Sequence, residues 1–97
     1  MATYVVLSNF TEQGIRSVKD STKRADAVKE LAKRYGVTAK DFYWTLGSYD
    51  VVVVFDAPDD ASMTALGLAI GSLGNVRTQT MRAFSREEMN GILAKLG

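Results

Sequence analysis

Few residues of this chain could carry out chemistry, because the sequence contains neither Cys nor His. That absence removes disulfides, thiolate nucleophiles, Cys/His zinc sites and the commonest general base. Proton transfer would fall to Asp, Glu, Lys or Tyr, and the pKa of such a group would need substantial tuning. We therefore expect no catalytic residue, no metal and no cofactor, and a non-catalytic role is favoured over an enzyme.

One candidate site is the stretch Gly47-Ser48-Tyr49-Asp50. In one interpretation it is the rim of a pocket, where Tyr49 donates and Asp50 accepts hydrogen bonds to a ligand. In the other it is a turn, in which Gly47 supplies the backbone geometry and Asp50 caps turn amides. The turn is favoured, because it explains the Gly and the Asp without a ligand.

Three aromatic residues, Tyr4, Tyr43 and Trp44, form a second candidate site. They could line an apolar cavity between two sheets, and concave apolar sites are where small molecules bind. They could equally be core and interface anchors, for which Trp and Tyr are enriched. The second interpretation is favoured, because aromatic side chains bury a large apolar area.

Arg77 and Arg82 are separated by an odd number of residues, so they point to opposite faces of their strand. Arg77 is kept as a candidate ligand-binding residue, since a guanidinium matches the geometry of a carboxylate or a phosphate. The favoured interpretation is a charged edge strand, or an ion pair with Asp50 or Asp56. Both explain the arginines without a ligand.

The segment Gln13-Gly14-Ile15-Arg16 follows the first strand and could overhang the same cavity. Gln13 and Arg16 are therefore added to the candidate ligand-binding residues. The glycine spacings of nucleotide-binding loops are absent from it.

The elements that must position these residues follow from hydrophobic periodicity. The sequence predicts strands over Thr3–Phe10, Val37–Leu46, Val51–Phe55 and Val76–Phe84, and helices from about Thr22 to Gly36, over Asp59–Leu73 and after a capping box at Ser85–Glu88. Thr11–Ser17 is expected to be a connector or a single helical turn. A tight turn at Gly47–Ser48 joins the second and third strands. Arg24, in the first long helix, is expected to face water.

This order, βαββαβ with a C-terminal helix, predicts one domain over residues 1–97 of the α+β class. Right-handed crossovers give a four-stranded antiparallel sheet with helices on one face, the ferredoxin-like arrangement. The first and third strands become the central pair. The length suits a single independently folding unit.

Apolar residues exceed what one chain of this size can cover. Val51–Phe55 is apolar on both faces and must be covered on both. The helix Asp59–Leu73 carries no charge after Asp60, so it is expected to be buried nearly all round. The final helix is expected to bury its apolar residues, Met89, Ile92, Leu93 and Leu96. Since the helices cover one sheet face, we expect the other to associate with a second copy, unless the terminal helix folds across part of it.

The stretch Phe42–Val52, FYWTLGSYDVV, resembles the signature of the GYD-domain family. The family is named for a Gly, a Tyr and an Asp, which are Gly47, Tyr49 and Asp50 here. The runs Gly71–Thr78 and Gln13–Arg16 also look like the family pattern, so the resemblance covers essentially the whole chain. It implies a fold similar to dimeric α+β-barrel proteins, small ferredoxin-like units whose sheets pair face to face. It implies no particular biochemical role.

Charge and hydropathy limit the partners. Twelve basic and eleven acidic residues give a net charge of +1, and the basic residues form no block. We therefore expect no nucleic acid and no anionic membrane as partner. The N-terminus lacks the charged region of a signal peptide, and no apolar run is long enough to span a bilayer. A cytoplasmic location is expected.

Three functions remain open, in order of preference. The first is a non-catalytic homodimer or higher oligomer that binds a small molecule between its subunits. The second is a cofactor-independent enzyme of the barrel-monooxygenase or isomerase kind, acting on a small aromatic substrate. In it Trp44, Tyr43 and Tyr49 would hold the substrate, with Asp50 as acid or base; fold analogy is its main warrant. The third is a ligand-sensing regulator of a partner protein, with a mobile loop around Thr11–Ser21.

Overall fold

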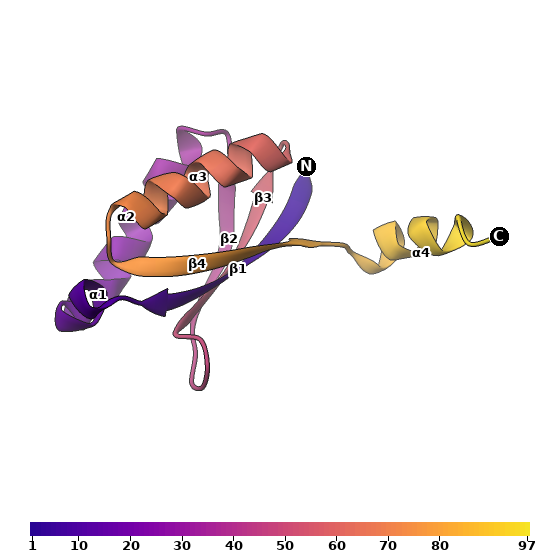
Figure 1. Ribbon diagram of the computed structural model, residues 1–97. Helices are drawn as coiled ribbons and strands as arrows, with labels where there is room; N and C mark the ends of the chain where they lie inside the picture. The colour runs from indigo at the N-terminus through magenta and orange to yellow at the C-terminus, as the bar shows by residue number, and fades with distance from the viewer.

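A computed structural model describes the whole chain, residues 1–97 (Figure 1). Its strands are β1 (Ala2–Phe10), β2 (Thr38–Trp44), β3 (Val51–Ala57) and β4 (Val76–Ala83), and its helices are α1 (Glu12–Arg16), the 3-10 turn η1 (Val18–Asp20), α2 (Ser21–Lys33), α3 (Asp60–Ser72) and α4 (Arg86–Ala94). The predicted order of elements is confirmed.

The four strands form one antiparallel sheet in the order β2-β3-β1-β4. The central pair is β1 and β3, as predicted, and in their register Val6 lies opposite Val53. On its other side Val6 lies opposite Thr80 of β4. The ferredoxin-like α+β fold predicted from the sequence is therefore confirmed.

Helices α2 and α3 lie on one side of this sheet, here called the covered face (Figure 1). Strand residues of alternate positions point into the core beneath them, because successive side chains of a strand point to opposite faces. The core consists of Tyr4, Val6, Ala32, Val37, Val51, Val53, Phe55, Ala57, Met63, Leu66 and Ile70. Phe55 and Leu66 are only 1% and 0% exposed.

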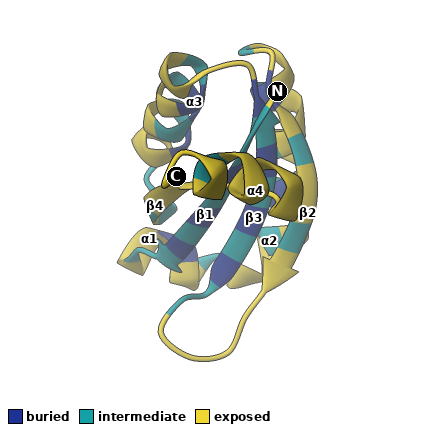
Figure 2. Cartoon of the chain, turned by 90° about the vertical axis from the view of Figure 1, so that its right-hand side faces the viewer, coloured by how far each residue is buried: buried dark blue, intermediate teal, exposed yellow.

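The opposite side of the sheet, here called the open face, carries the intervening residues of the same strands. On β3 these are Val52, Val54 and, at the end of the strand, Asp56, which are half-buried and alternate with the buried Val51, Val53 and Phe55. No helix packs on this side, and Figure 2 shows its strands uncovered apart from α4 standing in front of them. The prediction that the chain covers only one face of its sheet is confirmed.

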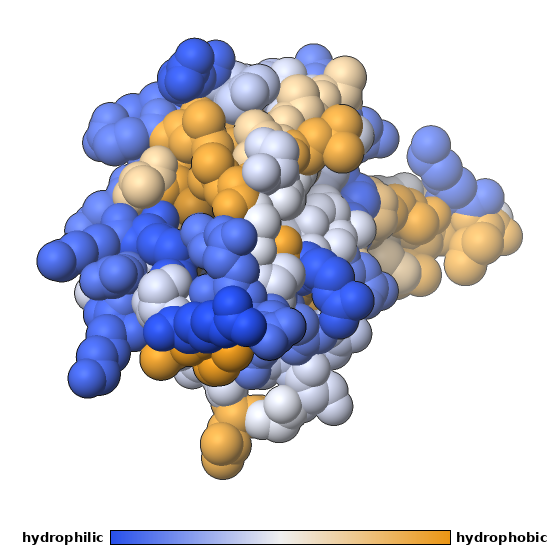
Figure 3. Space-filling view, turned by 60° about the vertical axis from the view of Figure 1, so that its left-hand side comes forward, coloured by the Kyte–Doolittle hydropathy of each residue, from blue (hydrophilic) through white to orange (hydrophobic).

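Helix α3 departs from the prediction of nearly complete burial. Its inner stripe, Met63, Leu66 and Ile70, is buried as expected. On its outer side, however, Leu68 is 71% and Leu73 is 57% exposed. A helix that packs on a sheet buries one side, and no further layer of this chain lies over α3. Apolar surface accordingly shows in the upper part of the helix side, where α3 lies (Figure 3).

Helix α4 departs further from its predicted burial than α3 does. It begins with the predicted capping box between Ser85 and Glu88. The expected burial of its apolar residues is wrong, since none of its residues is buried, and Leu96, which was expected in the same helix but lies beyond its end, is 82% exposed. The physical reason is that the chain after β4 stays extended and carries α4 away from the sheet (Figure 1).

The β2–β3 connection is longer than predicted. β2 ends at Trp44, so the expected strand through Leu46 is wrong by two residues. The amide of Thr45 donates to the carbonyl of Asp50 at 2.9 Å, which closes a loop of four residues. Within this loop Gly47 has φ +115°, a value that side-chain-bearing residues rarely adopt.

Candidate binding site

The sheet divides the candidate residues between its two faces. Phe42 and Trp44 of β2 share the covered face with Tyr4, whereas Tyr43 lies opposite Val52 on the open face. Tyr43 and Trp44 are neighbours in one strand, so they cannot line the same cavity within one chain. The three aromatic residues singled out from the sequence therefore do not form one cluster.

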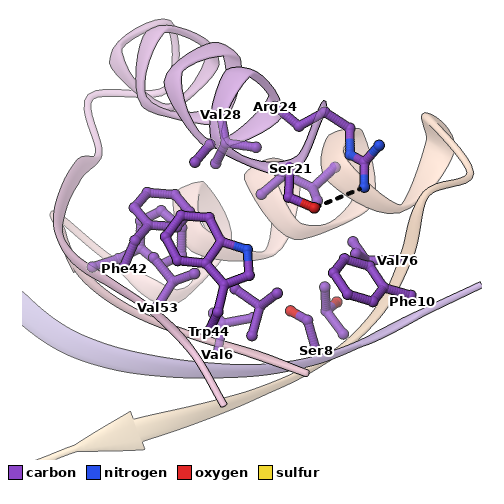
Figure 4. A pocket seen from close by; sticks show the side chains of 15 residues that line it. Val6, Ser8, Phe10, Ser21, Arg24, Val28, Phe42, Trp44, Val53 and Val76 are labelled. Carbon is purple, nitrogen blue, oxygen red and sulfur yellow. Dashed lines mark hydrogen bonds between the residues drawn. The ribbon is translucent and has the colours of Figure 1, made fainter. Parts of the chain in front are cut away.

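The covered face has a small apolar cavity, about 70 Å³ in volume, between the sheet and α2 (Figure 4). Val6, Phe42 and Val53 line it from the sheet and Val28 from the helix. Trp44 lies at its edge, stacked on Phe42 with ring centroids 6.2 Å apart. This is a different cavity from the one expected between two sheets.

Arg24 borders the same cavity and has a structural role that the sequence did not predict. Its guanidinium donates to the carbonyl of Ser17 at 2.7 Å and to that of Gly14 at 3.2 Å. It also lies over the ring of Phe10, 5.9 Å from its centroid. The expectation that Arg24 faces water is wrong. Arg24 precedes Val28 by one helical turn, and residues at this spacing lie on the same side of a helix, so the sequence did contain a signal for its position. No buried side-chain polar atom here lacks a hydrogen-bond partner.

On the open face a groove of about 300 Å³ brings together two of the predicted site residues. Tyr49 reaches it from the β2–β3 loop, and its hydroxyl donates to Gln79 of β4 at 3.1 Å. Arg77 lines the same groove, with Leu7 and Asn9 of β1 beside it. An unpaired guanidinium beside a phenol could hold a carboxylate or a phosphate.

Asp50 has a different role from the predicted one. Its carboxylate accepts from the amide of Phe10 at 2.9 Å, and its own amide donates to the carbonyl of Ser8 at 2.9 Å. It thus continues the β1–β3 pairing beyond Ser8 and Val51 and does not cap amides of its own turn. The expectation that Asp50 caps turn amides is therefore wrong about the amide, which belongs to Phe10 of β1.

Gln13 and Arg16 lie in α1, away from the Tyr49 groove. Gln13 donates to the carbonyl of Leu73 at 3.1 Å and to the side chain of Asn75 at 3.0 Å. A Cβ at Gly14 would lie 1.9 Å from the carbonyl oxygen of Asn75, so only glycine permits this contact. The segment expected to be a mobile loop is therefore helical at α1 and η1 and tied to the α3–β4 connection.

Arg16 makes only a local contact, an exposed ion pair with Glu12 of the same helix at 2.6 Å. Such pairs contribute little to stability. Neither Gln13 nor Arg16 lines either of the two cavities.

Arg82 fixes the end of the sheet from which α4 departs. It pairs with Glu88 at 3.2 Å, not with Asp50 or Asp56 as the sequence suggested. Its guanidinium also lies over the rings of Phe84 and Tyr4, 4.5 and 5.7 Å from their centroids. The pKa of the Glu88 carboxyl is lowered, mainly by the hydrogen bond from the Ser85 amide and secondly by the hydrogen bond from Arg82.

Tyr4 joins the same end of the sheet to α3. Its hydroxyl donates to the carboxylate of Asp60, and this bond, with burial, raises the pKa of Tyr4. At the start of α3 the carboxylate of Asp59 accepts from the amide of Ser62 at 2.7 Å, which lowers the pKa of Asp59. Both carboxylates therefore lie at the start of the helix that the sequence predicts from Asp59.

A four-stranded antiparallel sheet with helices on one side and an apolar open face defines a small α+β protein of the ferredoxin-like class. Residues 4–93 match the GYD domain model, so the chain belongs to the GYD domain family.

Two proteins of Thermus thermophilus are similar to it. One is a glutamine synthetase and cystathionine beta-lyase binding protein, 36% identical over 84 residues, which are 86% of this chain and 88% of the relative. The other is TTHA0845, whose crystal structure matches with a TM-score of 0.57 at 25% identity, covering 88% of this chain and 95% of that one. No helix of the structure is long and apolar enough to cross a membrane.

Proposed function

We propose that this protein is a non-catalytic, homo-oligomeric protein-binding domain whose copies associate through the open faces of their sheets. The observation that carries the proposal is the open face itself. Its centre is apolar, with Val5 and Leu7 of β1 beside Val52 and Val54 of β3. Tyr43 and Met81, 55% and 42% exposed, extend this surface onto the edge strands. Contiguous exposed apolar surface marks an interaction site.

Composition of the rim supports the same proposal. Polar and charged residues such as Asn9, Arg77 and Gln79 surround one end of the apolar centre. An apolar centre with a polar rim is the usual anatomy of a protein interface. Under a two-fold axis one copy would offer the other the same apolar surface.

The relative's name supports a role in binding other proteins. That protein is described as binding glutamine synthetase and cystathionine beta-lyase, and it aligns with nearly the whole of this chain. By analogy we propose that this protein binds an enzyme partner, in the cytoplasm. A small anionic molecule in the groove of Tyr49 and Arg77, between two copies, is the finer part of the proposal.

The proposed association is tested by light scattering coupled to size-exclusion chromatography. The wild-type chain should elute at twice its own mass or more. Val52→Lys on the open face should elute as a monomer, because association would bury an unpaired charge. Leu68→Lys, at the 71% exposed position of α3, is the control and should keep the wild-type mass. A monomeric wild-type chain at all concentrations would contradict the proposal.

The enzyme alternative receives no support from the geometry. It requires Trp44, Tyr43 and Tyr49 around one substrate with Asp50 as acid or base. Within one chain Trp44 and Tyr43 lie on opposite faces of the sheet. The carboxylate of Asp50 is already bound to the amide of Phe10.

A further inference from the structure

Helix α4 carries an apolar stripe that its own chain leaves uncovered. Met89 and Leu93 of α4 are 43% and 48% exposed, and Leu96, two residues beyond its end, is 82% exposed. Phe84, just before the helix, is 51% exposed. Met89 and Leu93 are one helical turn apart on α4, and Leu96 continues the same spacing beyond its end, which is the pattern of a helix that packs on another surface.

The short length of α4 also indicates that it packs on another surface. α4 has nine residues. Isolated helices shorter than about 12–15 residues are marginal in water, and their stability in proteins comes mainly from packing. A helix this short, with a capping box but no packing partner in its own chain, is therefore expected to pack on another surface.

Backbone conformation and the contacts of Arg82 set the direction in which α4 leaves the sheet. Ser85 is extended, with φ −68° and ψ 168°. Arg82 links the helix to the sheet, because it pairs with Glu88 and also donates to the carbonyl of Thr3 at 3.3 Å. These contacts orient the start of α4 relative to β1 and β4.

The direction is away from the covered face. In Figure 1 α4 projects to the side opposite α2 and α3, and in Figure 2 it stands in front of the open face. A copy seated on the open face would therefore lie beside α4.

We propose that α4 packs on a second copy of this chain, so that two associated copies exchange their C-terminal helices. The proposal rests on the association through the open face, and it adds that α4 is part of the same interface. Under a two-fold axis each copy gives one helix and receives one. The exposed apolar stripe and the uncovered sheet then become buried in a single step.

The first test compares two neighbouring substitutions by the dissociation constant of the dimer, measured by sedimentation. Leu93→Glu places a charge on the apolar stripe and should raise the constant by about tenfold or more, the effect of losing one buried leucine. Ala94→Glu places the same charge one residue further on, on the polar side of α4. It should change the constant by about twofold or less. Circular dichroism checks that both variants fold.

The second test locates α4 directly. Because the chain has no Cys, a nitroxide at Lys95→Cys labels one position only. Spin-labelled chain is mixed with ¹⁵N-labelled wild-type chain, and the exchange predicts broadened amide signals in the ¹⁵N copy. In a second sample the spin-labelled chain itself carries the ¹⁵N and is diluted in unlabelled wild-type chain. If amide signals broaden in this sample only, the helix folds back on its own chain, and the exchange is overturned.

The outcomes separate the two proposals. If Val52→Lys is monomeric while Leu93→Glu dimerises as tightly as the wild type, the open-face association stands and the exchange is wrong. If the wild-type chain is monomeric throughout, both are wrong. If Leu93→Glu weakens the dimer and the nitroxide broadens the other copy, the exchange is supported.

Discussion

The two faces of the sheet are built from the same strands and from similar residues, yet only one is covered. In β3 the buried Val53 and Phe55 alternate with the half-buried Val52 and Val54. In β1 the buried Val6 lies between Val5 and Leu7. The difference comes from connectivity, because both crossover helices lie on the same side of the sheet. Apolar content thus shows that a strand must be covered, and topology decides whether its own chain does so.

The largest predicted effect is a difference in the free energy of unfolding between a substitution on the covered face and one on the open face. Phe55→Ala empties a site that is 1% exposed and should lower the free energy of unfolding by about 3–5 kcal/mol. Val54→Ala, the adjacent residue on the open face, should cost the monomer less than about 1.5 kcal/mol, because Val54 is only half-buried there. Urea denaturation at low protein concentration measures both. Equal losses would mean that the two faces are equally covered.

Next in size is the close contact that ties α1 to the α3–β4 connection on the covered side. Gly14→Ala places a Cβ 1.9 Å from the carbonyl oxygen of Asn75, so the two segments must separate. The expected loss is about 1–3 kcal/mol. Gly67→Ala in α3 is the matched control, since no atom lies within 4 Å of its Cβ. It should leave stability unchanged or raise it by up to about 1 kcal/mol.

A smaller effect is expected at Asp50, which joins the hairpin to β1. Asp50→Ala removes the acceptor of the Phe10 amide and should cost about 1–2 kcal/mol. Asp50→Asn keeps an acceptor oxygen and should lose less. If instead Asp50→Ala is as stable as the wild type, this hydrogen bond does not contribute to stability. The interpretation of Asp50 as a ligand-binding residue then regains support.

The smallest effect concerns α4, on the open side. The pKa of Glu88 lies below its ordinary value of 4.5, because the ionised carboxylate accepts from the Ser85 amide and pairs with Arg82. A lowered pKa stabilises the folded form above about pH 4.5, and this contribution disappears as pH falls through the folded-state pKa. NMR titration should show the amide signals of α4 shifting in that window. Ser85→Ala, which removes the other half of the capping box, should weaken α4 at every pH.

Local structure of this chain followed directly from its residues. The capping box at Ser85–Glu88, the start of α3 at Asp59 and the positive φ of Gly36 after α2 each depend on neighbours in the sequence. The alternating burial of β1 depends only on the two-residue period of a strand. The order of elements then left the ferredoxin-like topology as the expected arrangement.

Long-range contacts were not predictable in the same way. The role of Asp50 depends on Phe10, forty residues earlier, and the grouping of Tyr49 with Arg77 depends on the sheet bringing the hairpin loop beside β4. The position of Gly14 against Asn75 likewise joins distant segments. Periodicity assigns a residue to a face, but it does not say which element covers that face.

The sequence by itself determined the strands, the helices and the surplus of apolar residues, since these follow from local spacing and side-chain type. Only the tertiary structure decided that the surplus lies on one open sheet face, on the outer side of α3 and on a detached α4. The reason is physical: burial depends on which surfaces the crossovers bring together, and this chain brings two helices to one face and none to the other.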